Sequence, residues 1–287
     1  MAGTNYIKTA MLMALMGAVL IGIFALAGWW SGSGSTGAII GFATLGFIIA
    51  IAMNFIMYWF SDKMVIRATH AKPADPVKYR RLHEMVERLS NNARIPKPDV
   101  YVVNRRDPNA FATGRGPGHA VVAVHTGLLD MMSDQEVEGV LAHEITHVKN
   151  RDILISTIAA VFAMLISYSY ILFWIVSDRR GMLGLAGMLI AMIAAPIIAA
   201  LIQMAISRTR EYAADAGGAE ISNPLHLASA LEKLGGITVQ YPERSGESEK
   251  AMSHMYISNP FGGSVKSLFS THPPMEERVR RLRAMRR

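Results

Sequence analysis

Two histidines and a glutamate that could activate a water molecule stand in the segment His143-Glu144-Ile145-Thr146-His147. On a helix, residues four apart lie on one face one turn apart, so both imidazoles can reach a single ion. Ser133 to Glu136 has the form of a capping box, which predicts that a helix begins just upstream. Glu144 would lie beside the ion, where its carboxylate can take a proton from water. The pattern predicts metal-assisted hydrolysis.

The alternative is that these residues are surface side chains on an exposed helical turn. The residues around them argue against this, because they would make the helix apolar enough to be buried. Two histidines and a glutamate are costly to bury without a metal ion or a polar partner. We therefore favour a metal site. The apolar neighbours are Val140, Leu141, Ala142, Ile145 and Val148.

A catalytic zinc ion takes three protein ligands and keeps one position for water, so a third ligand is needed. Glu211 is the candidate, although 64 residues separate it from His147. The two apolar blocks between them form a pair that returns to its starting side, so the two residues can meet. Asp215, one turn beyond, could accept the free N–H of a ligand histidine and fix its tautomer. The alternative for Glu211 is a surface ion pair with an adjacent arginine, Arg208 or Arg210.

Four apolar blocks of 22 to 24 residues contain no charged side chain. A helix needs about 20 such residues to cross the hydrocarbon core of a membrane. The first two predict transmembrane helices, at about 9–30 and 38–60, joined by a short periplasmic loop. The other two, at about 153–176 and 185–206, predict an apolar hairpin that either crosses the membrane or dips in and returns.

The charges beside the blocks predict the orientation. The loop at Ser31–Gly37 has no charge, whereas Lys8 precedes the first block and Lys63 and Arg67 follow the second. The positive-inside rule then places the N-terminus and residues 61–287 in the cytoplasm. The first block is longer than a usual signal-peptide core and a second follows almost at once, so we expect an uncleaved anchor.

The remaining segments predict a small mixed domain. Asp99–Val103 and Ala120–His125 are rich in valine and predict strands, while helices are expected after Asp75-Pro76, Asn223-Pro224 and Pro273-Pro274. The fold class expected is α+β: a mainly helical integral membrane protein with a zincin-like cytoplasmic metalloprotease domain and a small β-sheet.

The composition indicates which classes of binding partner to expect. The net charge is +7, but the basic residues cluster beside the apolar blocks and in the tail from Arg278 to Arg287, without a phosphate-binding loop or an RNA-binding aromatic pattern. A lipid bilayer is the expected partner and nucleic acid is not. The chain has no cysteine, which excludes thiol nucleophiles and cysteine-ligated zinc.

The ordered set of motifs resembles the HtpX family of membrane zinc proteases, in the gluzincin group that also includes the CaaX prenyl endoprotease. The resemblance rests on the two N-terminal spans, Asn109–Gly114, the His143–His147 helix, the apolar hairpin, Glu211–Asp215 and Ser270–Pro273. It implies one catalytic Zn²⁺ on a multi-pass protein of the prokaryotic cytoplasmic (inner) membrane, with the active site facing the cytoplasm. The substrates it implies are damaged or misassembled membrane proteins.

The resemblance also implies further active-site residues that the spacing of the motifs does not reveal. His272 and Arg278 would stabilise the oxyanion of the tetrahedral intermediate, with Glu144 as the catalytic base. Asn109 and its neighbours would lie beside the cleft, and Ala120–His125 could then serve as an edge strand that receives an extended substrate. Two alternatives remain open: a CaaX-type processing protease, and a non-enzymatic membrane adaptor whose HExxH is inert.

Overall fold

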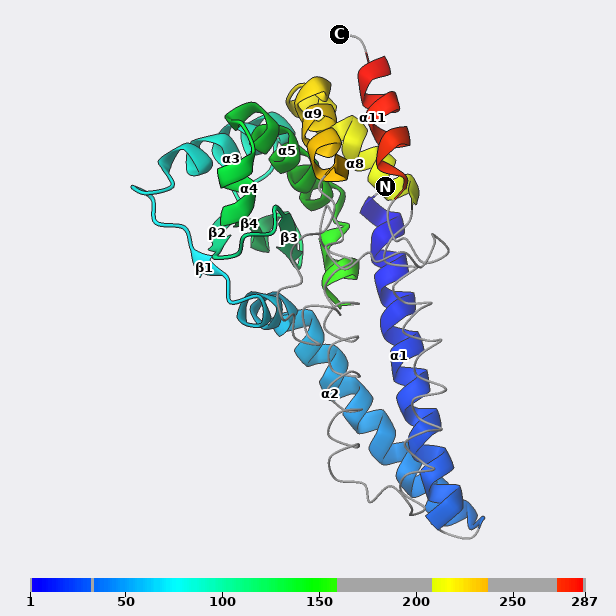
Figure 1. The fold of residues 1–287 in the computed structure, drawn as a ribbon. Helices are drawn as coiled ribbons and strands as arrows, with labels where there is room; N and C mark the ends of the chain where they lie inside the picture. Colours follow the sequence, from blue (N-terminus) through cyan, green and yellow to red (C-terminus); the bar gives the residue numbers. More distant parts are fainter. Residues whose placement is uncertain (1, 32–33, 159–207, 237–272, 286–287) are drawn as a thin grey trace. The chain divides into compact units, whose positions relative to one another are not determined.

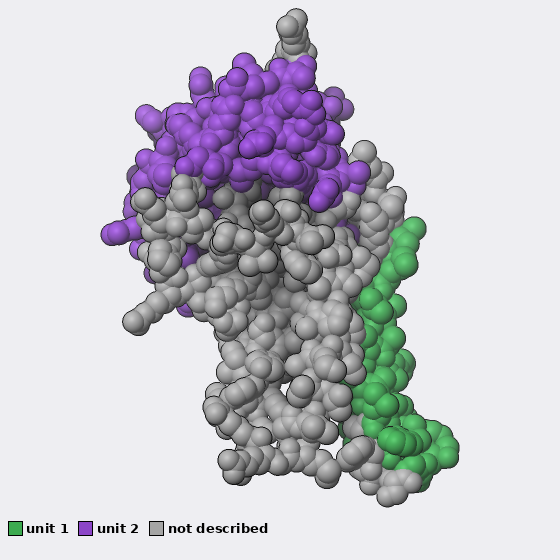
Figure 2. Space-filling view, turned by 45° about the vertical axis from the view of Figure 1, so that its right-hand side comes forward, with its two compact units in different colours: residues 1–61 green, residues 62–287 purple. Residues whose placement is uncertain are grey.

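The computed structural model describes residues 2–31, 34–158, 208–236 and 273–285. These residues form two compact units, 1–61 and 62–287, coloured green and purple in Figure 2. The first unit holds two long apolar helices, and the second holds a small sheet with helices packed against it (Figure 1). The candidate active-site residues that the structure describes all belong to the second unit.

Helices α1 (Ala2–Ser31) and α2 (Thr36–Ala68) are long and apolar enough to cross a membrane. Glycines let their backbones come close: a Cβ at Gly28 would lie 2.7 Å from the carbonyl oxygen of Ala38. Large apolar side chains on α2 are exposed, among them Phe47 at 52% and Phe55 at 59%. Exposed apolar faces of this length fit the hydrocarbon of a bilayer. The predicted spans lie inside these helices, and α2 continues beyond the predicted end at Phe60.

The predicted apolar hairpin falls almost entirely outside the described residues. Ile153–Ile158, at the start of its first arm, is helical. The rest of that arm, the whole second arm at 185–206, and the loop expected at 241–270 are not described. Whether the hairpin crosses the membrane stays an open prediction.

The sheet has the strand order β1-β2-β4-β3. Strand β1 (Lys72–Pro73) pairs antiparallel with β2 (Asp99–Val103), β2 pairs parallel with β4 (Ala120–His125), and β4 pairs antiparallel with β3 (Ala110–Gly114). The predicted strands β2 and β4 are confirmed with their bounds. The expectation that Ala120–His125 is an edge strand is wrong, because β4 lies between β2 and β3. The outermost strand on that side of the described sheet is β3.

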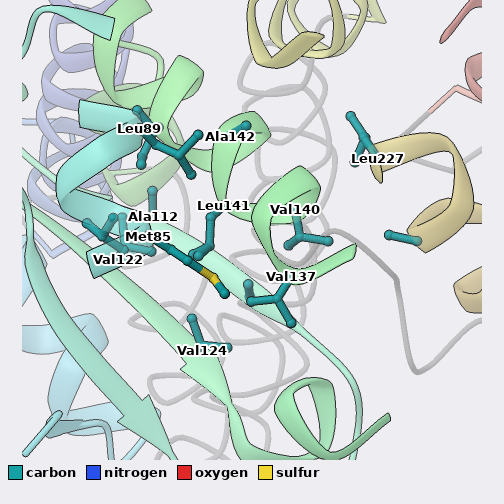
Figure 3. Packing of buried hydrophobic residues seen from close by; sticks show 14 of the residues in the cluster. Met85, Leu89, Ala112, Val122, Val124, Val137, Val140, Leu141, Ala142 and Leu227 are labelled. Atoms are coloured by element: carbon teal, nitrogen blue, oxygen red, sulfur yellow. The ribbon is translucent and has the colours of Figure 1, made fainter. Parts of the chain in front are cut away.

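One face of this sheet forms the core with two helices, α3 (Arg80–Ala93) and α5 (Asp134–Asn150). Figure 3 shows Ala112 of β3 and Val122 and Val124 of β4 beside Met85 and Leu89 of α3 and four residues of α5, Val137, Val140, Leu141 and Ala142. Side chains two apart on a strand share a face, which is why the even-numbered strand residues meet the helices. Helix α3 begins at Arg80, later than Asp75-Pro76 predicts, because the Asp75 carboxylate accepts from Val77 and Lys78 N–H in a preceding turn.

Two short helical elements lie on either side of β4 in the chain, and three further helices complete the described part of the second unit. The short ones are η1 (Pro117–His119) and α4 (Thr126–Met131). Helices α8 (Arg208–Ile221) and α9 (Pro224–Gly236) pack directly against α5, and α11 (Met275–Ala284) packs against α8 and α9. Helices α9 and α11 follow the predicted starts at Asn223-Pro224 and Pro273-Pro274.

The capping box predicted at the start of α5 is present and is tied to α9. Ser133 and Glu136 hydrogen-bond reciprocally at the helix N-terminus. The Glu136 carboxylate also accepts from Lys233 Nζ at 2.6 Å and Ser229 Oγ at 2.7 Å. Burial raises the pKa of Glu136, but these donors outweigh it and lower the pKa to about 2. The first turn of α5 is therefore fixed from two sides.

Candidate active site

Helix α5 carries the two histidines and Glu144 into the interior of the second unit. His143 is 2% exposed and Glu144 4%, and the side chain of His147 is 15% exposed. The surrounding positions of α5 are buried against the sheet, α3, α8 and α9. The prediction that this helix is buried is confirmed, and the alternative of an exposed turn is excluded.

Helix α8 brings Glu211 to these histidines. Two glycines on α8 allow the close approach: a Cβ at Gly217 would lie 2.5 Å from Thr146 Cγ2, and one at Gly218 would lie 3.1 Å from the His143 nitrogen. Glu211 is 5% exposed, so it is not a surface ion-pair residue as the alternative required. Two segments 64 residues apart thus meet as predicted.

The ligand atoms of His143, His147 and Glu211 converge. The two Nε2 atoms are 3.1 Å apart, and the Glu211 oxygens lie 3.7 Å from His143 Nε2 and 3.5 Å from His147 Nε2. Three ligands about 2.0–2.2 Å from one tetrahedral zinc ion lie about 3.3–3.6 Å apart. The three residues therefore fit a metal ion of this size without rearrangement.

The other ring nitrogens show that the converging atoms are acceptors. His143 Nδ1 lies 2.9 Å from Asp215 Oδ1, and His147 Nδ1 lies 3.2 Å from Asp152 Oδ2. An ionised carboxylate only accepts, so each Nδ1 carries a proton and each Nε2 is the ring atom left to face a metal ion. Two imidazole Nε2 atoms and a carboxylate facing one point need a cation between them, either a metal ion or a proton on one Nε2.

A positive charge is expected between the ligand atoms. Four buried carboxylates lie around the site, with two buried guanidinium groups. Burial lowers the pKa of His147, but hydrogen bonds to Asp152 and Glu211 outweigh it and raise the pKa to about 10, so without a metal ion this imidazole holds a proton that a bound metal ion would replace. Burial lowers the pKa of His143 and keeps it neutral. The carboxylates are those of Glu144, Asp152, Glu211 and Asp215, and the guanidiniums are those of Arg210 and Arg278.

Asp152 is a site residue that sequence reasoning missed. Helix α5 ends at Asn150. The next residue, Arg151, caps it in a left-handed conformation with φ 61°, and the Asp152 N–H then bonds back to the His147 carbonyl. This turn folds Asp152 under the histidine five positions earlier. The sequence signal was a charged residue just past the helix end, but the left-handed turn occurs at an arginine, where it is uncommon.

The structure describes one of the two proposed oxyanion donors. Arg278 on α11 is fully buried, and its Nε and Nη2 donate to both oxygens of Asp215 at 2.8 and 2.7 Å. Burial raises the pKa of Asp215, but Arg278 and His143 outweigh it and lower the pKa to about 2. His272 lies outside the described residues, so its role stays a prediction.

Glu144 faces strand β3. Its carboxylate accepts a hydrogen bond from the Ala112 backbone N–H, and burial raises its pKa to about 7. Asn109, at the start of this segment, is buried, and its side-chain oxygen accepts from the Ala110 N–H. The segment expected beside the cleft is thus a strand in contact with Glu144.

Known proteins match this chain over most of its length. Residues 76–286 match the model of peptidase family M48. A protease HtpX homolog from Desulfatibacillum aliphaticivorans is 48% identical over 98% of this chain and 90% of its own. One from Persephonella marina is 51% identical over 98% and 97%, and one from Paraburkholderia phytofirmans is 47% identical over 99% and 98%.

A solved structure also matches, with weaker similarity. The crystal structure of S. mikatae Ste24p is 18% identical, with a TM-score of 0.49, and the match covers 97% of this chain and 65% of that one. The family assignment rests instead on the full-length sequence relatives and the family model, which agree with the gathered His143, His147 and Glu211. This chain belongs to peptidase family M48 and, within it, to the HtpX membrane metalloproteases.

Proposed function

We propose that this chain is a zinc-dependent endopeptidase that hydrolyses damaged or misassembled membrane proteins. His143, His147 and Glu211 would hold the ion, and Glu144 would be the catalytic base. The observation that carries the proposal is the convergence of two imidazole Nε2 atoms and a carboxylate, with each imidazole fixed by an acidic partner. Such a donor set, with a fourth position left for water, is typical of catalytic zinc.

Glu144 moves the proton in the proposed reaction. A bound zinc ion would supply Lewis acidity, which polarises the scissile carbonyl and lowers the pKa of water toward about 7. The Glu144 carboxylate takes one proton from the attacking water as its oxygen bonds to the carbonyl carbon. It delivers that proton to the leaving nitrogen as the carbon–nitrogen bond breaks. His272 is the proposed donor to the oxyanion.

Strand β3, next to Glu144, is the proposed partner for the substrate backbone. The His125 N–H bonds to the Asn109 carbonyl, so the alternation of an antiparallel ladder directs the backbone carbonyls of Ala110 and Ala112 away from β4. Their N–H groups already bond to Asn109 Oδ1 and Glu144, and an extended peptide could donate to the two carbonyls, beside Glu144. Backbone pairing of this kind selects little by sequence, which suits varied unfolded substrates.

The proposed location is the prokaryotic cytoplasmic membrane with the site facing the cytoplasm. The support is the uncharged loop at Ser31–Gly37 and the basic residues on either side of the first two spans. Substrates emerging from a bilayer would then reach a protease anchored in the same membrane.

Substitution of Glu144 by glutamine tests the proposal. The variant should bind one zinc ion per chain as the wild type does, because a ligand is not removed. Cleavage of an unfolded membrane protein by purified, zinc-loaded enzyme should fall at least 10²–10⁴-fold, the contribution typical of a general base. Turnover near the wild-type rate would rule out Glu144 as the base. A wild-type enzyme that cleaves a prenylated CaaX peptide but not unfolded membrane proteins would favour the processing-protease alternative.

A further inference from the structure

Arg278 occupies an unusual position for a basic residue. It is fully buried, although it lies on a helix whose other arginines, such as Arg280 and Arg283, are exposed. Buried charges are rare unless they are paired. Its surroundings therefore indicate what it does.

The guanidinium of Arg278 is committed to helix α8. Nε and Nη2 form a two-pronged pair with the two oxygens of Asp215, at 2.8 and 2.7 Å. Nη1 makes no hydrogen bond among the described residues but lies 3.7 Å from Glu211 Oε2, within range of an ion pair, and Nη2 lies 3.4 Å from His143 Nδ1. Asp215 and Glu211 are one helical turn apart, so one planar fork contacts both.

This fork also fixes the orientation of His143. A carboxylate held at both oxygens cannot rotate, so Asp215 Oδ1 stays 2.9 Å from His143 Nδ1. Nη2 has no lone pair and cannot accept the Nδ1 proton, so Asp215 is the acceptor and Nε2 keeps its lone pair. Removal of the fork would free both the Asp215 carboxylate and, through it, the imidazole.

We infer that Arg278 is a positioning residue of the metal site, which acts through Asp215 on His143 and steadies Glu211, rather than a donor to the substrate oxyanion. The inference rests on the proposed zinc site. It makes α11 part of that site: the helix packs on α8 and α9 through Val279 and Leu282, and this packing sets Arg278. A segment far along the chain thus completes the ligand geometry.

The test is the zinc affinity of full-length protein in detergent, measured by competition with a chromophoric chelator. Arg278→Gln should weaken zinc binding about 10–100-fold, the usual cost of losing a residue that orients a ligand. Arg278→Lys keeps the charge without the fork and should lie between. Arg280→Gln, on the same helix and exposed, is the matched control and should bind as the wild type does. The visible spectrum of the Co²⁺-loaded enzyme should change in Arg278→Gln and not in the control.

A double-variant cycle distinguishes positioning from a direct role. If Arg278 acts through Asp215, the pair Asp215→Asn with Arg278→Gln should bind zinc about as weakly as Asp215→Asn alone. Unchanged zinc affinity in Arg278→Gln with a lower kcat, or losses that multiply in the double variant, would overturn the inference. If Arg278→Gln does not fold, Arg278→Lys carries the test, and unchanged affinity there counts against it.

The wild type and Glu211→Ala are measured alongside. Zinc bound by the wild type and lost in Glu211→Ala supports the proposed ligand set independently of Arg278. A wild type that binds no zinc removes the proposed function and this inference together. Wild-type binding with normal Arg278 variants removes this inference alone.

Discussion

At the scale of the residue, the site is two imidazoles oriented by carboxylates. His143 and His147 each donate from Nδ1 to an acidic partner, at 2.9 and 3.2 Å, so each turns its Nε2 toward Glu211. The two partners come from different places: Asp215 from α8 and Asp152 from the turn that ends α5. Each imidazole is thus oriented independently, and damage to one partner should leave the other imidazole in place.

Substitution of Asp152 by asparagine should weaken the site without removing a ligand. The amide oxygen can still accept from His147 Nδ1, but it lacks the charge that stabilises the metal-bound imidazole. We expect zinc affinity to fall about 10–100-fold, whereas Glu211→Ala should abolish stoichiometric binding. Metal content after dialysis against graded chelator separates the two. If Asp152→Asn kept wild-type affinity, the carboxylate would be a helix-end residue only.

At the scale of the element, close helix packing carries the ligands. Gly217 and Gly218 let α8 approach the histidine turn of α5, and Gly139 does the same between α5 and α9. A Cβ at Gly139 would lie 2.4 Å from the Leu227 nitrogen and 2.6 Å from the His226 carbonyl carbon, both backbone atoms that cannot move aside. The positions of these helices depend on small residues at their crossings.

Gly139→Ala should therefore destabilise the second unit. Alanine favours a helix by about 1 kcal/mol, but the clash with α9 backbone should cost more, for a net loss of about 1–3 kcal/mol. Thermal unfolding of the detergent-solubilised protein measures it. Gly236→Ala, on α9, is the control, because no atom of the described residues beyond its own helix backbone lies within 4 Å of an added Cβ. It should leave Tm within a degree or so of the wild type or raise it. Equal Tm values for both variants would contradict the packing argument.

Local patterns predicted much of the element arrangement. The capping box, the valine-rich strands β2 and β4, and the Pro-initiated helices α9 and α11 depend on nearby residues. Strand β3 was not predicted as a strand because its sequence, Ala-Phe-Ala-Thr-Gly, is strand-forming only through pairing with β4. The expectation that Ala120–His125 is an edge strand was wrong for the same reason: the insertion of β4 between β2 and β3 is a long-range pairing that no local pattern encodes.

The site was predictable where helical spacing or the expected return of the chain decides the contact. Helical period brings His143 and His147 together, and the expectation that the two apolar blocks return the chain to its starting side predicted that Glu211 meets them. Asp152 was missed because its contact requires a left-handed turn at an arginine. The partner of Arg278 was missed because a buried guanidinium in a basic tail looks, in sequence, like its exposed neighbours.

At the scale of the whole molecule, the chain joins a membrane anchor to a hydrolytic unit. The two apolar helices occupy residues 1–61 with α2 continuing to Ala68, and the ligand residues lie between 143 and 211. The basic residues beside the anchor are what predict its orientation. Since the chain has no cysteine, single introduced thiols can report which side of the membrane each unit faces.

Cysteines at Ser35, between α1 and α2, and at Val77, 87% exposed in the second unit, should lie on opposite sides. A membrane-impermeant maleimide applied to intact spheroplasts should label Ser35→Cys, whereas Val77→Cys should react only after the membrane is permeabilised. The reason is the positive-inside rule, which keeps Lys63 and Arg67 in the cytoplasm with everything that follows. The cysteine-free parent is the control for background labelling. Labelling of Val77→Cys in intact spheroplasts would place the hydrolytic unit outside the cytoplasm and would contradict the proposed location.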